Sequence, residues 1–259
     1  MVKSSQCPIC HDRGLRLLET GAVPCLCIQE RNRMRLRQKA GLTPGMEEFT
    51  FRNFSLDYYS KQLCHPDKYI SYYQGARQAV QAAEAFVQEF LKDAHTSGLM
   101  FVGPIGSGKT FLAAAICNAL IDVGVKVQFV VVPDLLDELR ASYRRPYWVS
   151  NRDENRSEDW GNEPLIERVL KVPLLVLDDL GAHNYTDWTR NTIYSLLNYR
   201  MNYRLPVVIT TNLGLNELDG FLGERTTSRI IYLCRSFRLM VEKDIRHIKS
   251  QEREGRYRR

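Results

Sequence analysis

Apolar residues along the chain fall into short continuous runs separated by stretches with helical spacing. The runs, at residues 99–102, 125–132, 174–177 and 206–210, have the length of strands that are buried on both faces. Helical patterns occupy residues 110–123, 134–143 and 188–202 between them. This alternation predicts an α/β fold in which helices cover both faces of a parallel sheet.

The regions outside this alternation differ in composition and predict the domain boundaries. Residues 1–40 contain four of the seven cysteines and end in a basic run, with little to build a core. Residues 41–96 comprise a linker rich in aromatic residues and, after it, an amphipathic helix from Ala76 to Leu91. The α/β domain covers residues 97–246, with a polar surface insertion at 145–162, and residues 247–259 form a basic tail.

The first predicted strand runs directly into a glycine-rich loop. The loop consists of Gly103, Pro104, Ile105, Gly106, Ser107, Gly108, Lys109 and Thr110, and Phe111 follows it. These residues match the phosphate-binding pattern G-x-x-x-x-G-K-[ST]. The predicted strand before the loop and the predicted helix after it are the context that this pattern requires, and they argue against the alternative of a plain glycine-rich turn. Backbone N–H groups and the helix N-terminus would bind phosphates, Lys109 would reach the β- and γ-phosphates, and Thr110 would ligate Mg²⁺. The loop with Phe111 therefore predicts an ATP site.

Two carboxylates follow the apolar run at residues 174–177. A buried strand that ends in an acid beside the phosphate loop is the usual means of holding Mg²⁺, and we assign this role to Asp178. Asp179 lies where a water-activating carboxylate is expected, although glutamate is the usual residue and aspartate is one methylene shorter. A helix cap or turn is the alternative for the pair, but it does not suit so apolar a run. Because aspartate is shorter than the usual glutamate at this position, we expect slow or partner-dependent ATP hydrolysis.

Three further polar residues complete the predicted catalytic set. Asn212 follows the fourth apolar run, where an amide can position the attacking water; an ordinary loop asparagine is the alternative. Arg225 and Arg229 are four residues apart and share one helical face. If that face points out of the subunit, one of the two could reach a neighbour's γ-phosphate as an arginine finger. Exposed salt bridges are the other interpretation of this pair.

Four cysteines lie near the N-terminus as Cys7-x-x-Cys10 and Cys25-x-Cys27, separated by fourteen residues. This spacing is close to that of structural zinc sites, although C-x-x-C is commoner for the second pair. About thirty residues bury too little surface to fold alone, whereas structural zinc supplies on the order of 10 kcal/mol. We predict zinc bound by these four thiols; His11 is a less favoured ligand, and four unrelated reduced thiols are the alternative.

The charge distribution and the absence of long apolar runs limit the class of protein. The formal net charge of +6 suits an anionic partner without requiring one. Basic residues gather at positions 31–39 and 253–259. The first group could contact DNA or a protein, or could be a solvated helix face. We find no apolar run of about 18 residues and no secretory signal, so we expect a cytoplasmic protein without a membrane partner.

The order of these motifs resembles that of the AAA+ ATPases and, more narrowly, the DnaC/DnaI group of replicative helicase loaders. The strings that carry the resemblance are the phosphate loop, Leu177-Asp178-Asp179-Leu180-Gly181, Thr210-Thr211-Asn212-Leu213 and Glu224-Arg225-Thr226-Thr227-Ser228-Arg229. The cysteine pairs also agree with that group, and residues 45–246 match it best. The resemblance implies a hexameric replicative helicase and single-stranded DNA as partners, and self-association through the ATP sites.

The same resemblance implies residue roles and one departure from the family pattern. Lys109 and Thr110 would bind phosphate and Mg²⁺, Asp178 and Asp179 would form the acidic pair, and Asn212 would be the first sensor. Arg229 would be the preferred finger and Arg225 the second candidate. Only thirty residues follow Arg229, too few for a full helical lid. The second sensor arginine that such a lid carries is therefore left open among Arg235, Arg238 and Arg246.

The predicted function is an ATP-binding and ATP-hydrolysing loader that binds the replicative helicase and helps deliver it to single-stranded DNA. The alternative function is that of a transposition helper ATPase of the IstB type, a class of protein that shares much of this core but acts on a transposase. The cysteine module favours the loader because it provides a separate partner-binding element. A small-metabolite kinase fits the Thr-Thr-Asn string and the arginine pair poorly. The intact Lys109, Thr110 and Asp178 argue against a DNA-binding zinc protein with a vestigial ATP site.

Overall fold

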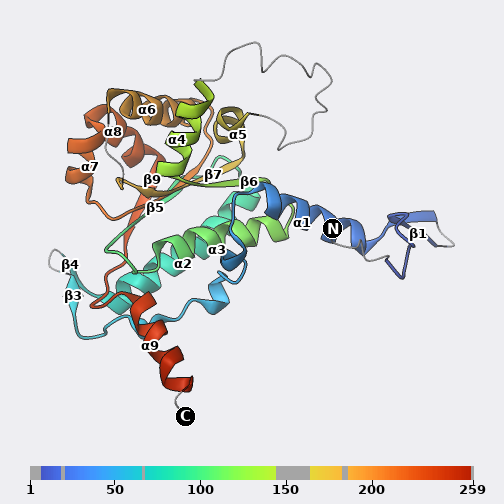
Figure 1. The fold of residues 1–259 in the computed structure, drawn as a ribbon, viewed down its shortest axis with the longest axis horizontal. Helices are drawn as coiled ribbons and strands as arrows, with labels where there is room; N and C mark the ends of the chain where they lie inside the picture. The colour runs from blue at the N-terminus through green and yellow to red at the C-terminus, as the bar shows by residue number, and fades with distance from the viewer. Residues whose placement is uncertain (1–6, 19–20, 66–67, 144–163, 183–185, 258–259) are drawn as a thin grey trace.

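A five-stranded parallel sheet forms the centre of the computed structural model, which describes residues 7–18, 21–65, 68–143, 164–182 and 186–257 (Figure 1). The strands are β5 (Gly98–Val102), β6 (Val127–Val131), β7 (Leu174–Leu180), β8 (Val207–Thr211) and β9 (Cys234–Arg238). Their order is β6-β7-β8-β5-β9, and all pairs are parallel. The predicted fold class is confirmed. The predicted insertion at 145–162 lies outside the described residues.

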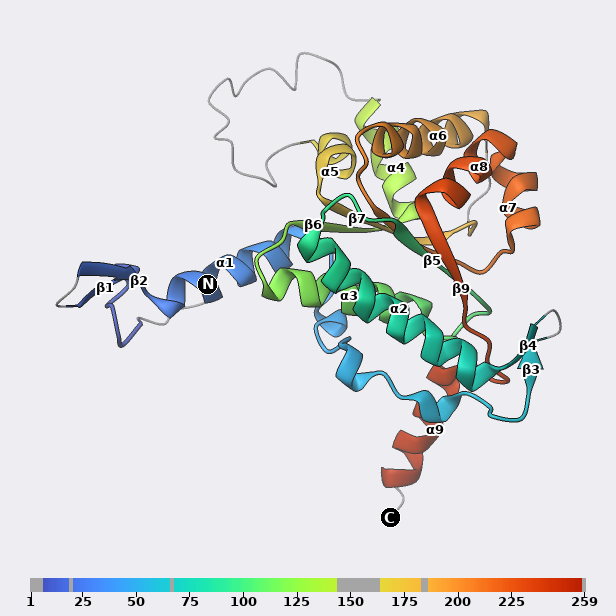
Figure 2. The same cartoon turned by 180° about the vertical axis from the view of Figure 1, so that it is seen from behind.

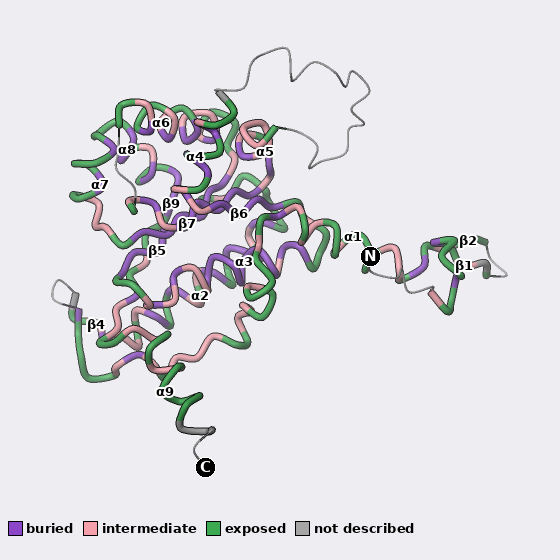
Figure 3. The backbone as a smooth tube through the Cα atoms, viewed as in Figure 1, coloured by how far each residue is buried: buried purple, intermediate pink, exposed green. Residues whose placement is uncertain are grey.

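Helices cover both faces of this sheet (Figures 1 and 2). One face carries α2 (Tyr72–Lys92) and α3 (Lys109–Asp122), and the other carries α4 (Val132–Tyr143), α5 (Leu165–Lys171), α6 (Asp187–Asn202), α7 (Leu215–Leu222) and α8 (Glu224–Leu233). Strand β7 alternates between the two cores: Leu174 and Val176 pack with α2 and α3, whereas Leu175 and Leu177 pack with the other helices. In Figure 3 the strands β5, β6 and β7 are drawn almost entirely in the colour of buried residues.

Two elements of the sheet domain differ from the sequence prediction. Helix α4 begins at Val132, two residues before the start that the sequence pattern predicted, so Asp134 lies in its first turn. Strand β9 was missed because it is an edge strand, in which only Cys234 is buried and the other residues are exposed or half-buried. Gly124 follows the last turn of α3 with φ 87° and donates its N–H to the Ile121 carbonyl at 2.9 Å, as a glycine that ends a helix does.

The N-terminal residues project from the sheet domain as a separate module (Figures 1 and 3). It consists of an antiparallel hairpin, β1 (Leu15–Leu18) and β2 (Gly21–Pro24), followed by α1 (Leu26–Lys39). The linker then makes three short 3₁₀ helices, η1 (Pro44–Met46), η2 (Phe51–Asn53) and η3 (Leu56–Tyr58), and the hairpin β3 (Cys64–His65) and β4 (Lys68–Ser71). Helix α9 (Ile245–Tyr257) includes most of the predicted basic tail. No helix among the described residues is long and apolar enough to cross a membrane.

Arg200 is a fully buried charge that joins several of these elements. It lies on α6 with 0% exposure. Its guanidinium donates to five backbone carbonyls at 2.8–3.3 Å, those of Val169, Leu170, Val172, Pro173 and Pro206. These carbonyls belong to the end of α5 and to the residues before β7 and β8. Burial lowers the pKa of Arg200 to about 9. The carbonyl dipoles thus stabilise a cation and fix the amino ends of two central strands.

We expect Arg200→Lys to lower the free energy of unfolding by about 3 kcal/mol, because lysine cannot reach five acceptors with one ammonium and leaves buried carbonyls unpaired. Urea unfolding followed by circular dichroism measures the change. Arg190→Lys is the matched control, since Arg190 is an exposed residue of the same helix, 4.0 Å from Asp187. It should alter stability by less than about 0.5 kcal/mol. Equal stability of both variants would refute the role assigned to Arg200.

Candidate nucleotide-binding site

The phosphate loop connects the carboxyl end of β5 to the first turn of α3, as the sequence predicted. Gly106 and Gly108 have φ of 72° and 89°, a region that side chains rarely adopt. Gly103 is required for a different reason: a Cβ atom there would lie 1.9 Å from the Leu239 carbonyl oxygen. The loop therefore has the curled backbone that turns successive N–H groups toward one point, next to the positive end of α3.

Lys109 is the one cation of the loop, and it is only 6% exposed. Its Nζ donates to the carbonyl oxygens of Gly103 and Pro104, both at 2.8 Å. Burial lowers the pKa of Lys109 to about 8, against the opposite influence of Asp179 and Asp178. Phosphate oxygens bound at the loop would replace these two carbonyls as acceptors, so the ammonium is already directed to the phosphate position.

Asp178 and Thr110 meet at the carboxyl end of β7, as predicted for a Mg²⁺ site. The Thr110 hydroxyl donates to Asp178 Oδ1 and Oδ2 at 3.0 and 3.2 Å. The Thr210 hydroxyl of β8 donates to Asp178 Oδ1 at 2.6 Å. Burial raises the pKa of Asp178, and these two hydroxyls partly offset the effect. A hydroxyl and a carboxylate are hard oxygen ligands that suit Mg²⁺, which would neutralise phosphate charge when bound.

Asp179 and Asn212 are brought together at the same edge of the sheet. Asn212 Nδ2 donates to Asp179 Oδ1 at 3.1 Å. Asp179 has φ 58°, an uncommon value for a residue other than glycine, at a shift of register between β7 and β8. Its N–H donates to the Thr210 hydroxyl at 2.9 Å, which holds this conformation. Thr210 therefore contacts both aspartates, through the carboxylate of Asp178 and the backbone N–H of Asp179, a role that the sequence analysis did not assign to it.

Arg225 and Arg229 lie on α8, where they differ in environment. Arg229 is half-buried, and its guanidinium donates to Asn198 and Tyr194 of α6 at 2.8–3.0 Å and lies 4.2 Å from the Tyr194 ring centroid. It also donates to the Arg225 carbonyl at 2.7 Å, and the Arg225 side chain is exposed. To act as a finger, Arg229 would have to exchange these partners for a neighbour's phosphate. The finger assignment stays a prediction.

The start of helix α9 contacts the phosphate loop. The Ile245 N–H donates to the Gly106 carbonyl at 3.2 Å, and a Cβ atom on Gly106 would meet Asp244 Oδ1 at 1.8 Å. Of the three arginines left open, Arg235 pairs with Glu89 at 2.8 Å and Arg238 contacts His65 at 2.7 Å. Arg246 follows Ile245 in sequence, and its positive charge lowers the pKa of Lys109.

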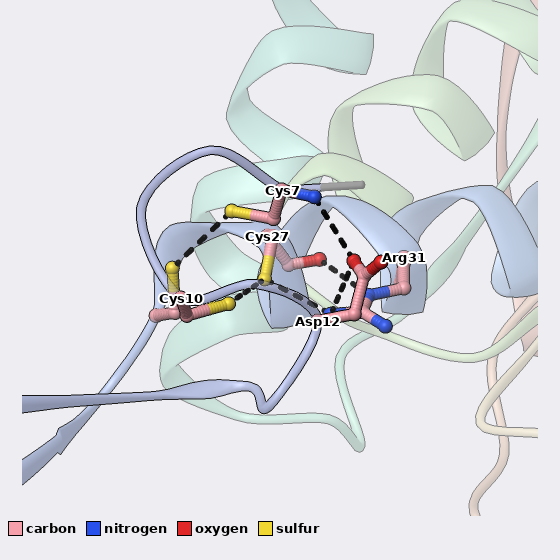
Figure 4. A network of polar contacts seen from close by, with 6 residues as sticks. Cys7, Cys10, Asp12, Cys27 and Arg31 are labelled. Carbon is pink, nitrogen blue, oxygen red and sulfur yellow. Dashed lines mark hydrogen bonds and ion pairs between the residues drawn. The ribbon is translucent and has the colours of Figure 1, made fainter. Parts of the chain in front are cut away.

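The four N-terminal cysteines form one cluster, away from the phosphate loop (Figures 1 and 4). Their sulfur atoms all lie within 4.8 Å of one another, with Cys10 Sγ 3.3 Å from Cys27 Sγ and Cys7 Sγ 3.8 Å from Cys25 Sγ. The first pair lies on a tight turn, and the second lies at the start of α1. His11 is exposed, and it does not belong to this group of possible metal ligands found in the described part of the chain.

The environment of the cluster fits a metal ion held by thiolates. Arg31 Nη2 donates to Cys27 Sγ at 3.0 Å, and Asp12 accepts the Cys7 N–H at 3.0 Å (Figure 4). Hydrogen bonds of this kind orient metal ligands and stabilise a sulfur anion. Two other arginines of the basic run make ion pairs, Arg33 with Glu30 and Arg37 with Asp122. These pairs favour the solvated-face interpretation for this part of α1.

These features define an ATP-binding protein with an AAA+ core. A family model described as "IstB-like ATP binding protein" matches residues 72–252, and the chain belongs to this family. The chain is 26% identical over 216 residues to the "Replicative helicase loader DnaC" of Escherichia coli (strain K12), covering 82% of this chain and 76% of that relative. It is 30% identical over 167 residues to the "Replicative helicase loader DnaI" of Bacillus subtilis (strain 168), covering 60% and 49%.

The similarity extends to solved structures. A crystal structure of DnaI superimposes with a TM-score of 0.58 and 25% identity, over 80% of this chain and 99% of that one. The resemblance to the DnaC/DnaI group is therefore confirmed at the level of both sequence and fold. The individual roles of the site residues and the proposed domain boundaries remain predictions.

We expect ATP affinity to depend on pH through Lys109. Below pH 8 its ammonium is protonated and attracts phosphate; above about pH 8 the charge is lost, so binding must take up a proton. The dissociation constant for Mg-ATP should rise roughly fivefold to tenfold between pH 7.5 and 9, a range above the titration of the γ-phosphate. Titration of a fluorescent ATP analogue measures it. Lys109→Ala should bind weakly and lack this pH dependence; the same slope in both proteins would disprove the assignment.

Proposed function

We propose that this protein is an ATP-dependent loader of the replicative DNA helicase. The observation that carries the proposal is the similarity to DnaC over 216 residues, which includes the phosphate loop and the acidic strand end. ATP would bind between the loop and the C-terminal segment, with Mg²⁺ held by Thr110 and Asp178. Asp179 and Asn212 would orient the attacking water. A cytoplasmic location, where replication takes place in bacteria, is part of the proposal.

Slow, partner-dependent hydrolysis follows from the geometry at Asp179. Its carboxylate is one methylene shorter than glutamate and is engaged by Asn212 at 3.1 Å. Activation of water would require this hydrogen bond to be rearranged, for example by a neighbouring subunit that supplies Arg229 or Arg225. Of the three arginines considered as a second sensor, we favour Arg246, because its charge is close enough to Lys109 to lower the pKa of that residue. ATP would then act as an assembly switch more than as a source of rapid work.

The four-cysteine cluster is proposed to hold a structural zinc ion. Four thiolates are the usual ligand set of closed zinc sites, and all four protein ligands leave no position for a substrate. The module would therefore dock a partner, which we propose to be the helicase, and single-stranded DNA is the second proposed partner of the protein. A transposition helper remains the second candidate, because the family model is named after IstB.

Freshly purified protein should contain about one zinc ion per chain by elemental analysis, because the module is too small to fold without it. Cys7→Ser should lose the metal. Cys64→Ser is the matched control, since Cys64 is an exposed cysteine outside the cluster. A zinc content well below one in the wild type, or equal retention in the two variants, would contradict the proposal.

A pull-down with the replicative helicase from the same source tests the loader function. The wild type and Lys109→Ala should both retain helicase, whereas Cys7→Ser should lose most of it. Loading of helicase onto single-stranded DNA, read as strand separation, should fall at least tenfold in Lys109→Ala but not in Lys92→Ala, an exposed control. Failure of the wild type to retain helicase with any nucleotide would refute the proposal, and retention of a transposase instead would favour the second candidate.

A further inference from the structure

One tyrosine of the linker contacts the phosphate loop directly. Tyr59 follows η3 and is 3% exposed. Its hydroxyl donates to the carbonyl oxygen of Ser107 at 2.8 Å. A Cβ atom on Gly108 would lie 2.8 Å from the Tyr59 hydroxyl oxygen and 3.1 Å from the Phe54 ring. The side of the loop at Ser107 and Gly108 is thus covered by the linker, with no room for a side chain between them.

The Tyr59 ring is itself held by aromatic packing. It stacks on Phe54 at a centroid distance of 5.7 Å, and the Phe54 ring meets Phe111 edge-on at 5.5 Å. Phe111 in turn stacks on Phe49 at 4.5 Å. Burial raises the pKa of the Tyr59 phenol, so the group remains a donor at physiological pH. The position of the hydroxyl is therefore fixed by side chains on both the linker and α3.

The consequence for the loop follows from the planarity of the peptide bond. In a trans peptide the C=O and the next N–H point in opposite directions. The Ser107 carbonyl, which would otherwise be a buried acceptor, is directed outward to Tyr59. The N–H of Gly108 is then directed to the opposite side, into the concave face where a phosphate loop binds its ligand. Without that bond, the Ser107–Gly108 peptide would lose the contact that fixes its orientation.

We propose that Tyr59 is a positioning residue for ATP binding, which orients the Ser107–Gly108 peptide so that the Gly108 N–H faces the phosphates. The inference rests on ATP binding at the loop and does not depend on the identity of the protein partner. It assigns to the linker a part in the nucleotide site, although the residue lies about fifty positions before the loop. The phosphates of ATP and ADP would both sense this orientation.

Tyr59→Phe removes only the hydroxyl and tests the proposal. The dissociation constants for Mg-ATP and Mg-ADP should rise about fivefold, the effect of one hydrogen bond. The ¹⁵N–¹H NMR signal of Gly108 should shift less on saturation with Mg-ADP than in the wild type, a readout that a general loss of stability would not change. Tyr58→Phe is the matched control. The Tyr58 hydroxyl donates to Glu252 of α9 at 3.3 Å, and the affinity of this variant for Mg-ATP and Mg-ADP should stay within twofold of the wild type.

Three outcomes would overturn the inference, and they differ from one another. Wild-type affinity in Tyr59→Phe would remove the role of the hydroxyl alone. Weakened affinity with a normal Gly108 shift and a lowered melting temperature would make Tyr59 a structural residue only. Absence of ATP binding by the wild type would instead overturn the nucleotide site itself, which the Lys109 titration detects independently.

Discussion

The phosphate loop imposes the constraint on which the rest of the domain depends: several backbone N–H groups must point one way, and their carbonyls must be satisfied elsewhere. Buried carbonyls without partners are costly, so each needs a donor. Here Lys109 serves the carbonyls of Gly103 and Pro104, Tyr59 serves Ser107, and the Ile245 N–H serves Gly106. The donors come from α3, the linker and the C-terminal segment. A short loop thus contacts two parts of the chain that are distant in sequence, the linker and the C-terminal segment.

Buried charges are stabilised differently at the two ends of the sheet. At the carboxyl end, Lys109 and Asp178 have shifted pKa values, lowered and raised respectively, because burial disfavours both charges. Phosphate and a divalent cation, when bound there, would stabilise both charges. At the amino end, the guanidinium of Arg200 has five carbonyl acceptors. The same sheet therefore has one end arranged for binding and one end arranged for rigidity.

The parts that the sequence predicted well are those with a local signal. The strands buried on both faces, the loop and the acidic strand end each carry a continuous pattern, and a parallel sheet brings strand ends together without further information. Strand β9 lacked such a pattern because an edge strand needs only one buried residue, Cys234. The contacts of Tyr59, Thr210 and Asp244 depend on tertiary packing between segments distant in sequence. No spacing rule connects a linker tyrosine to a loop fifty residues away.

The linker also determines how the two ends of the molecule can communicate. From α1 it runs along the core: the Phe129 N–H donates to the Ala40 carbonyl at 2.6 Å, and Asn118 of α3 donates to the carbonyls of Met46 and Phe49 at 2.8 and 2.9 Å. It then reaches Ser107 through Tyr59. A ligand at either end shifts the other only if it binds two arrangements of this path unequally, and the effect is reciprocal. If Tyr59 orients the Ser107–Gly108 peptide as proposed, that peptide is the point at which nucleotide occupancy and linker position would be coupled. A partner docked on the cysteine module would then act on ATP only by favouring one of the two arrangements of this path.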